Sequence, residues 1–164
     1  MVIFREVQYM RRVWWILLLV LGVTAMMWWG FSQQIILGEP WGNNPSPDWM
    51  MWLLWLIVGI GFPLAFYWMR LIVEVLDDRV FIYYMPLLKS DILLEEIETV
   101  EARTYQPIRE FGGWGIRRRA GQRAYNVSGD QGVEITLQDG RKIMIGSQKS
   151  EELALAILMR LPKG

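Results

Sequence analysis

Arginine is the residue type whose spacing in this chain most directly suggests a binding chemistry. Arg117, Arg118 and Arg119 are consecutive, and further arginines lie close by on either side. A dense basic region of this kind suits loose electrostatic contact with anionic lipid headgroups, whereas an ordinary solvated strand edge is the alternative. Trp114 stands beside them, and an indole suits a membrane interface or a protein partner. The predicted lipid or partner contact residues are Arg109, Trp114, Arg117, Arg118, Arg119 and Arg123.

The residue types that many enzymes use near neutral pH are missing. The 164 residues include no cysteine and no histidine, which excludes thiolate nucleophiles, imidazole bases and the usual zinc sites. The acidic residues Glu95 to Glu101 suit the solvated face of a strand, and Asp130 and Asp139 fall in turn sequences, where Asp is common for backbone reasons. The sequence therefore predicts no catalytic residue, cofactor or metal site, and a protein that is not an enzyme.

Two further ligand classes are disfavoured by local sequence. The segment Phe111–Gly115 is rich in glycine but lacks the G-K-[ST] ending of a phosphate loop. It predicts instead a surface loop within residues 105–121 that exposes Trp114. One arginine cluster without interleaved stacking aromatics does not indicate nucleic-acid binding.

Two uncharged apolar runs, Val13–Phe31 and Trp49–Met69, precede the arginine cluster in the chain and determine where it lies relative to a membrane. At about 1.5 Å per residue, each run is long enough for a bilayer core about 30 Å thick. The first exceeds the apolar region of a cleaved signal peptide, which is usually about 7–15 residues. The sequence therefore predicts a transmembrane helical hairpin with spans at about 13–31 and 49–69.

Basic residues at the ends of the spans predict the orientation. Arg11 and Arg12 precede the first run and Arg70 follows the second, whereas the connecting segment Ser32–Asp48 has no lysine or arginine. Basic residues accumulate on the cytoplasmic side of membrane helices. We therefore expect a multi-pass protein of the cell (inner) membrane with cytoplasmic N- and C-termini.

Beyond Arg70 the composition changes to mixed charge, which divides the chain into a hairpin (1–70) and a cytoplasmic β domain (71–164). Short β-type runs separated by turn residues predict six strands, at Leu71–Leu76, Val80–Met85, Ile92–Thr104, Arg123–Val127, Gly132–Leu137 and Lys142–Ile145. The period then changes, and Ser150 followed by two glutamates predicts the start of a helix over about 149–161.

This arrangement resembles the prokaryotic two-helix membrane proteins with a bacterial pleckstrin-homology-like (bPH) domain. The resemblance is carried by the two spans, the strand pair around Asp77-Asp78-Arg79, the strand Ile92–Thr104 and the closing QDGRKIMIGSQKSEELALAI. It implies an α+β membrane protein in which the hairpin is followed by a bent antiparallel sheet or barrel capped by a C-terminal helix. Members often form oligomers, and most have no established function.

The leading functional hypothesis is a membrane-anchored scaffold or adaptor, in which the β domain presents a sheet edge to an unknown membrane or cytoplasmic protein or to another copy of itself. The alternative is a sensor of anionic lipid headgroups or of the state of the membrane, acting through the arginine cluster. An enzyme or small transporter subunit is the third. The expected partners are thus the lipid bilayer and a protein, possible homo-oligomers included, and no nucleic acid.

Overall fold

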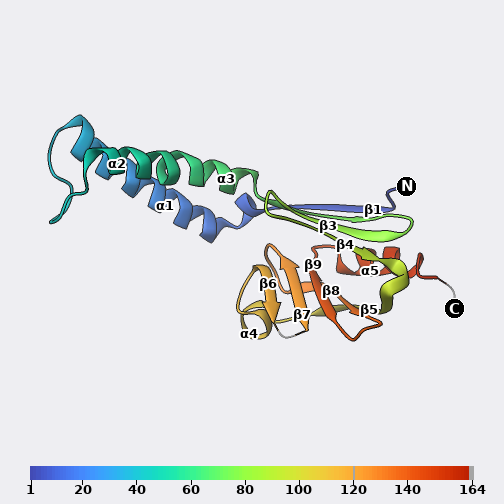
Figure 1. The fold of residues 1–164 in the computed structure, drawn as a ribbon. Helices are drawn as coiled ribbons and strands as arrows, with labels where there is room; N and C mark the ends of the chain where they lie inside the picture. The colour runs from blue at the N-terminus through green and yellow to red at the C-terminus, as the bar shows by residue number, and fades with distance from the viewer. Residues whose placement is uncertain (120, 163–164) are drawn as a thin grey trace. The chain divides into compact units, whose positions relative to one another are not determined.

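The computed structural model describes residues 1–119 and 121–162, and its chain divides into two compact units (Figure 1). The helical unit is Met10–Met69. The second, which we call the β unit, combines Met1–Tyr9 with the chain from Arg70 onward. The first nine residues therefore belong with the β strands, whereas the sequence analysis assigned residues 1–70 as a whole to the hairpin.

The helical unit is a hairpin of two long helices. In chain order its elements are a 3-10 turn (Met10–Arg12), α1 (Trp14–Phe31), a π-helical end (Ser32–Ile36), α2 (Asp48–Leu54), a π-helical stretch (Trp55–Gly61) and α3 (Phe62–Trp68). The two continuous helices contain 23 and 21 residues and are long and apolar enough to cross a membrane, as judged by length and composition.

Pro63 accounts for a cross-link between the two helices. It lacks a backbone N–H, and its ring excludes the carbonyl four residues earlier, which is that of Gly59. The Gly59 carbonyl instead accepts a hydrogen bond of 3.1 Å from Nε1 of Trp28 in α1. Nearby, the rings of Phe31 and Trp55 stack with their centroids 4.6 Å apart. Aromatic contacts thus join the two arms of the hairpin.

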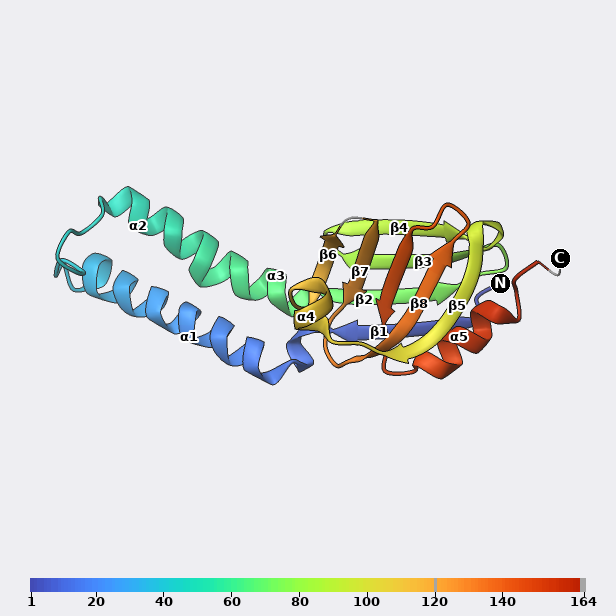
Figure 2. The same cartoon turned by 90° about the horizontal axis from the view of Figure 1, so that it is seen from below.

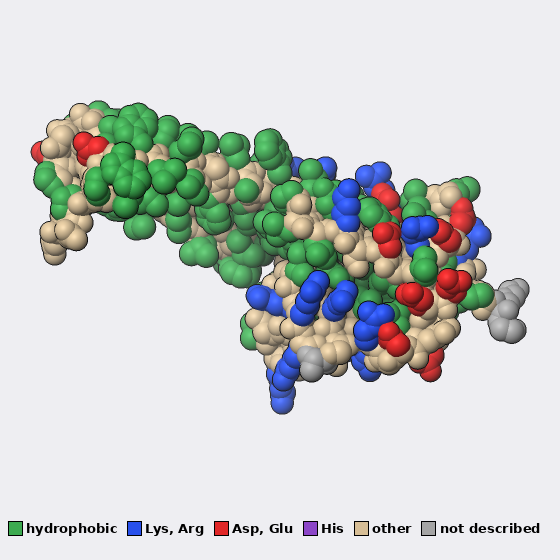
Figure 3. All heavy atoms as spheres, in the orientation of Figure 1, with side chains coloured by type: hydrophobic (Ala, Val, Ile, Leu, Met, Phe, Trp, Pro, Cys, Tyr) green, Lys and Arg blue, Asp and Glu red, His purple; other side chains and the backbone are tan. Residues whose placement is uncertain are grey.

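Most of the helical surface is apolar and lies open. In the most apolar window of each helix, only 22% and 17% of the residues are buried. Trp14, Trp29, Trp49 and Trp68 are each at least 62% exposed. Figure 3 shows a nearly continuous hydrophobic surface over this unit. The hairpin therefore covers little of its own apolar surface.

The β unit contains two sheets and a C-terminal helix. The four-stranded sheet has the order β1-β2-β3-β4, formed by Phe4–Tyr9, Arg70–Val75, Arg79–Met85 and Leu88–Leu93. The five-stranded sheet has the order β5-β8-β9-β7-β6, with β5 (Ile97–Thr104), β6 (Gly115–Arg119), β7 (Gln122–Asn126), β8 (Gln131–Leu137) and β9 (Lys142–Gly146). The sheets form two layers in Figure 1, and their strands cross steeply in Figure 2.

Alternating apolar side chains build the core of the β unit. Val80 and Ile82 of β3, and Val133 and Ile135 of β8, are fully buried. Because successive side chains of a strand point to opposite faces, these two strands contribute every second residue to the layer between the sheets. β2 and β9 are instead buried at consecutive positions. The C-terminal helix α5 (Ser150–Leu158) packs against β5 and β8, close to the position predicted at 149–161.

Strand β1 was missed by the sequence analysis because polar residues occupy its inward positions. Glu6 and Gln8 are only 8% and 7% exposed. The carboxylate of Glu6 accepts hydrogen bonds from the Ser147 hydroxyl and, at 2.9 Å, from the backbone N–H of Gln148. The Gln8 amide donates to the Gly146 carbonyl at 2.8 Å. These bonds satisfy the Glu6 carboxylate and Nε2 of Gln8, polar groups that a simple apolar alternation would not place inside.

Three other expectations change. The predicted strand Ile92–Thr104 is split by a 3-10 turn (Leu94–Glu96), so its first residues belong to β4 and the rest to β5. The expected loop over 105–121 contains α4 (Pro107–Phe111) and β6. An antiparallel sheet was expected, but the five-stranded sheet is mixed. Its strand β9 lies between β8 and β7 and pairs with β7 in parallel.

Candidate functional site

The hairpin of β6 and β7 places arginines on both faces of the five-stranded sheet. Arg118 is the cross-strand partner of Arg123, and Arg119 is the partner of Gln122. Since successive side chains alternate, Arg118 and Arg123 share one face, and Arg117 and Arg119 share the other. Like charges directly opposite each other in a sheet are destabilising. The pair Arg118–Arg123 therefore carries a local electrostatic cost.

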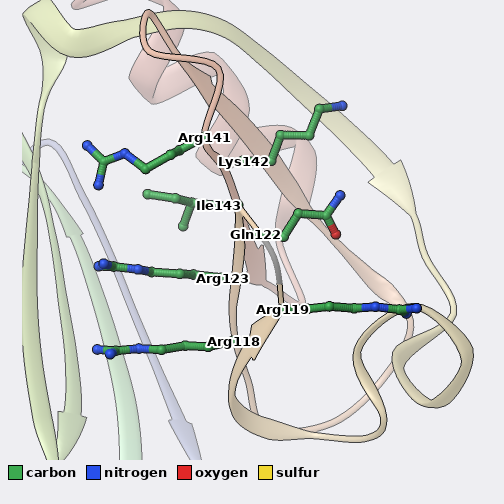
Figure 4. A pocket seen from close by; sticks show the side chains of 8 residues that line it. Arg118, Arg119, Gln122, Arg123, Arg141, Lys142 and Ile143 are labelled. Carbon is green, nitrogen blue, oxygen red and sulfur yellow. The ribbon is translucent and has the colours of Figure 1, made fainter.

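A pocket of about 360 Å³ lies at this hairpin (Figure 4). Arg118, Arg123 and Arg141 extend side by side from one face of the sheet, while Arg119 and Lys142 extend from the other. We call it the basic pocket, and its lining residues are Arg118, Arg119, Gly121, Gln122, Arg123, Arg141, Lys142 and Ile143. None of the described residues in this lining carries a carboxylate.

The parallel pairing of β7 with β9 brings Arg141, Lys142 and Ile143 to the pocket, although they lie about twenty residues after the arginine cluster in sequence. Arg123 lies beside Ile143 and Gln122 beside Lys142 in this register. Arg141 and Lys142 are not among the site residues predicted from sequence. A Gly-Arg-Lys sequence after a turn resembles many solvated strand starts, and only the insertion of β9 between β8 and β7 makes these residues neighbours of the arginine cluster.

Two of the cations are neutralised within the β unit. Nε of Arg141 lies 2.5 Å from a carboxylate oxygen of Asp139, and Nζ of Lys142 lies 2.9 Å from one of Glu134. Both acidic side chains lie outside the pocket lining. Arg141 and Lys142 thus contribute less net charge to the pocket than their number suggests.

Arg118 and Arg123 differ from these cations. In residues 1–119 and 121–162, neither guanidinium forms an ion pair or a hydrogen bond with another group. Arg118 is exposed and Arg123 is half-buried. Together with their cross-strand position, this leaves two adjacent positive charges without protein counter-ions at one side of the pocket.

The remaining residues predicted from sequence lie elsewhere. Arg109 is exposed and lines a neighbouring depression on the side of Arg119. Arg117 is exposed and does not line the basic pocket. Trp114 was expected to be exposed in a loop, but it is half-buried and its Nε1 donates a hydrogen bond of 2.9 Å to the Gly129 carbonyl. Arg118, Arg119 and Arg123 therefore line the basic pocket, Arg109 lines the neighbouring depression together with Arg119, and Arg117 and Trp114 line neither.

Nearly the whole chain matches one protein family. Residues 1–162 match a family of unknown function, DUF6141. The chain belongs to this family. No curated protein and no solved structure matches it. Because the match spans both units, the helical hairpin and the β unit of this DUF6141 member are parts of one family architecture.

Beside the basic pocket, this DUF6141 protein has an ion-pair network centred on Arg103. Nη2 of Arg103 lies 2.6 Å from Glu134 and 2.8 Å from Glu110. Burial raises the pKa of Glu134, but hydrogen bonds from Lys142 and Arg103 outweigh this effect and leave the pKa below its ordinary value. The hydrogen bond from Arg103 likewise lowers the pKa of Glu110, against the effect of burial.

This network predicts that the β unit of the DUF6141 protein loses stability in acid. A carboxyl group with a lowered folded-state pKa contributes stability above its ordinary pKa of 4.5, and this contribution is lost as the pH falls through the folded-state value. We expect Arg103→Met to lower the free energy of unfolding by about 1 kcal/mol at neutral pH. The difference should shrink as the pH falls through the lowered pKa values of Glu110 and Glu134, and vanish when both carboxyl groups are protonated in the folded state.

The measurement is urea unfolding across a pH series. A suitable protein is the joined β unit, in which residues 10–69 are replaced by an Asn-Gly turn between the register partners Tyr9 and Arg70. Arg109→Met removes an exposed arginine outside the network and serves as the control. A loss of stability that is independent of pH would contradict the assignment.

Proposed function

We propose that the helical unit anchors the chain in a lipid bilayer. The low burial of its two helices supports this, because a core helix of a soluble protein is mostly buried. Large apolar side chains such as Trp14 and Trp68, which are 71% and 62% exposed, would lie at the ends of the spans, where indole rings favour the interface.

The proposed topology places the β unit on the cytoplasmic side. β1 ends at Tyr9, immediately before the first helix, and β2 begins at Arg70, immediately after the second; the two strands pair along their length. A hairpin that crosses twice returns the chain to the same side, as this pairing requires. Arg11 and Arg12 in front of the first helix favour the cytoplasm for that side.

We further propose that the β unit is a member of the pleckstrin-homology-like class. Its support is the succession of a four-stranded sheet, a second sheet and a C-terminal helix in chain order. The parallel β7–β9 pair is a departure from the antiparallel arrangement that the resemblance implies.

The function that the geometry supports best is binding of anionic lipid headgroups by the β unit. The observation that carries it is the basic pocket, where Arg118 and Arg123 have no counter-ion among the residues that the structure describes. The cytoplasmic leaflet has a negative surface potential, and each basic residue near it contributes about 1 kcal/mol of attraction. The hairpin would hold the β unit near this surface at high local concentration.

Flotation of the joined β unit with phospholipid vesicles tests this proposal. We expect recovery with vesicles that contain anionic lipid, none with purely zwitterionic vesicles, and a decrease as salt rises and screens the charges. Substituting Gln for Arg118, Arg119 and Arg123 together should remove the bound fraction. Equal recovery on both kinds of vesicle would refute headgroup binding.

The scaffold hypothesis is the second candidate, and a sheet edge favours it. β4 and β6 each end a sheet. The three arginines of β6 disfavour addition of another strand, because charged side chains protect edge strands from pairing. β4 carries one lysine and one aspartate and is the more suitable edge. Isolation of the full chain in mild detergent would recover a stoichiometric partner or an oligomer if the scaffold role is right.

A further inference from the structure

The charges in the basic pocket define which anion fits it. Asp139 neutralises Arg141 and Glu134 neutralises Lys142, and Arg119 extends from the other face of the sheet, where it donates to the Glu110 carbonyl. On the face that carries Arg118 and Arg123, the excess charge therefore belongs to this cross-strand pair. Two adjacent positive charges are balanced by a dianion and only half balanced by a monoanion. The net charge of a phosphomonoester group is about −1.5 to −2 at neutral pH, whereas that of a phosphodiester group is about −1.

The shape of the pocket also suits a phosphomonoester. Arg118, Arg123 and Arg141 extend in parallel on one side of the sheet (Figure 4). Planar guanidinium groups bind phosphate oxygens through two hydrogen bonds each. The buried side chain of Ile143 adds an apolar contact, and a volume of about 360 Å³ leaves room for a small organic group next to the phosphate. Small-ligand pockets begin at about 300 Å³.

We infer that the basic pocket is a binding site for a phosphomonoester group, held by Arg118 and Arg123. This deepens the proposed headgroup binding, on which it rests, by naming the chemical class of the ligand. The group belongs either to a lipid with a terminal phosphate, such as phosphatidic acid, or to a soluble phosphate ester. The repulsion between the two guanidinium groups is relieved when the dianion lies between them.

The central experiment is calorimetric titration of the full chain in nanodiscs of phosphatidylcholine with glycerol 3-phosphate. We expect saturable binding, and weaker binding of the monoanionic diester dimethyl phosphate. Arg118→Gln with Arg123→Gln should weaken binding of glycerol 3-phosphate by about 100-fold, since each lost charge-assisted hydrogen bond is worth about tenfold or more.

The matched control removes the same charge from exposed positions outside the pocket. Arg109→Gln with Arg117→Gln should change the affinity by less than about threefold, which is the size of a screened surface effect. Equal losses in the two double variants would overturn the site and show attraction to overall charge only. Equal affinity for the monoester and the diester would overturn the assignment of a dianion.

Two lipid arms separate the possible sources of the phosphate. If a lipid supplies it, the full chain in phosphatidylcholine nanodiscs binds to phosphatidic acid vesicles in preference to phosphatidylglycerol vesicles of equal charge. If glycerol 3-phosphate binds but neither vesicle recovers the protein, the phosphomonoester site stands and the proposed headgroup function falls. If both vesicles recover the protein equally and glycerol 3-phosphate does not bind, the headgroup function stands and the site falls.

A stability measurement tests the same pair without any ligand. Because Arg118 and Arg123 repel each other, Arg123→Gln should raise the midpoint of thermal unfolding of the ligand-free protein, whereas Arg109→Gln should not. Glycerol 3-phosphate should then raise the midpoint of the unsubstituted protein and leave that of Arg118→Gln with Arg123→Gln unchanged. A fall in the ligand-free midpoint of Arg123→Gln would contradict the inferred repulsion.

Discussion

A chain that begins at Arg70 and lacks β1 is expected to lose cooperative unfolding and to aggregate, whereas the joined β unit should fold as a soluble monomer. β1 pairs with β2 from Phe4↔Val75 to Tyr9↔Arg70. Its removal would expose the edge of β2, a strand whose Leu71 and Val73 are fully buried. An open apolar edge strand is a site of aggregation.

The size of this effect follows from how many interactions β1 makes. Its loss would leave Ser147 and Gln148 without the Glu6 carboxylate and the Gly146 carbonyl without Gln8. Unmet buried polar groups cost about 1–3 kcal/mol each, which together approaches the about 5–15 kcal/mol that stabilises a typical domain. Circular dichroism during thermal unfolding and light scattering of the two proteins measure the difference. A monomeric, cooperatively unfolding fragment from Arg70 onward would contradict the role of β1.

The second large effect is expected at Gly146, where β9 approaches β7. A Cβ atom added to Gly146 would lie 2.6 Å from Cβ of Asn126 and 3.1 Å from its Cα. Real side chains do not tolerate such distances, so the parallel strand pair would have to separate. We expect Gly146→Ala to lower the free energy of unfolding of the joined β unit by about 3 kcal/mol, as overpacking of a rigid contact does. Urea unfolding measures this change.

A double-mutant cycle with Asn126→Gly isolates the steric cause. Asn126→Gly removes the Cβ that the new methyl group would meet, at the cost of the Asn126 hydrogen bonds to Tyr105 and Gly115. Gly146→Ala should therefore be less destabilising in the Asn126→Gly protein than alone. Strictly additive effects would show that the cost at Gly146 has another origin. The parallel pair that this contact supports also holds Ile143 beside Arg123 in the basic pocket.

The strands that local sequence predicted are those with an apolar inner face. β2, β3, β7, β8 and β9 all lie close to their expected positions, because each has apolar residues that the β unit buries, at alternate positions in β3 and at consecutive positions in β2 and β9. β4 was missed in its first half because it starts after the turn at Pro86, and its residues Lys89 and Asp91 interrupt the apolar pattern. β6 was missed because GIRRR has almost no apolar face to bury.

The composition and order of residues determined three properties of this DUF6141 protein by themselves: two long apolar helices, a β-rich remainder with a closing helix, and a local concentration of arginine. These three properties follow from local sequence patterns, that is, from which residues are adjacent along the chain. The place of β1 in the sheet and the composition of the basic pocket depend on residues far apart in sequence, such as Arg123 and Lys142. Strand pairing alone decides both features. Backbone hydrogen bonds can join any two strands whatever their side chains, so the local sequence of a strand does not specify which strand it pairs with.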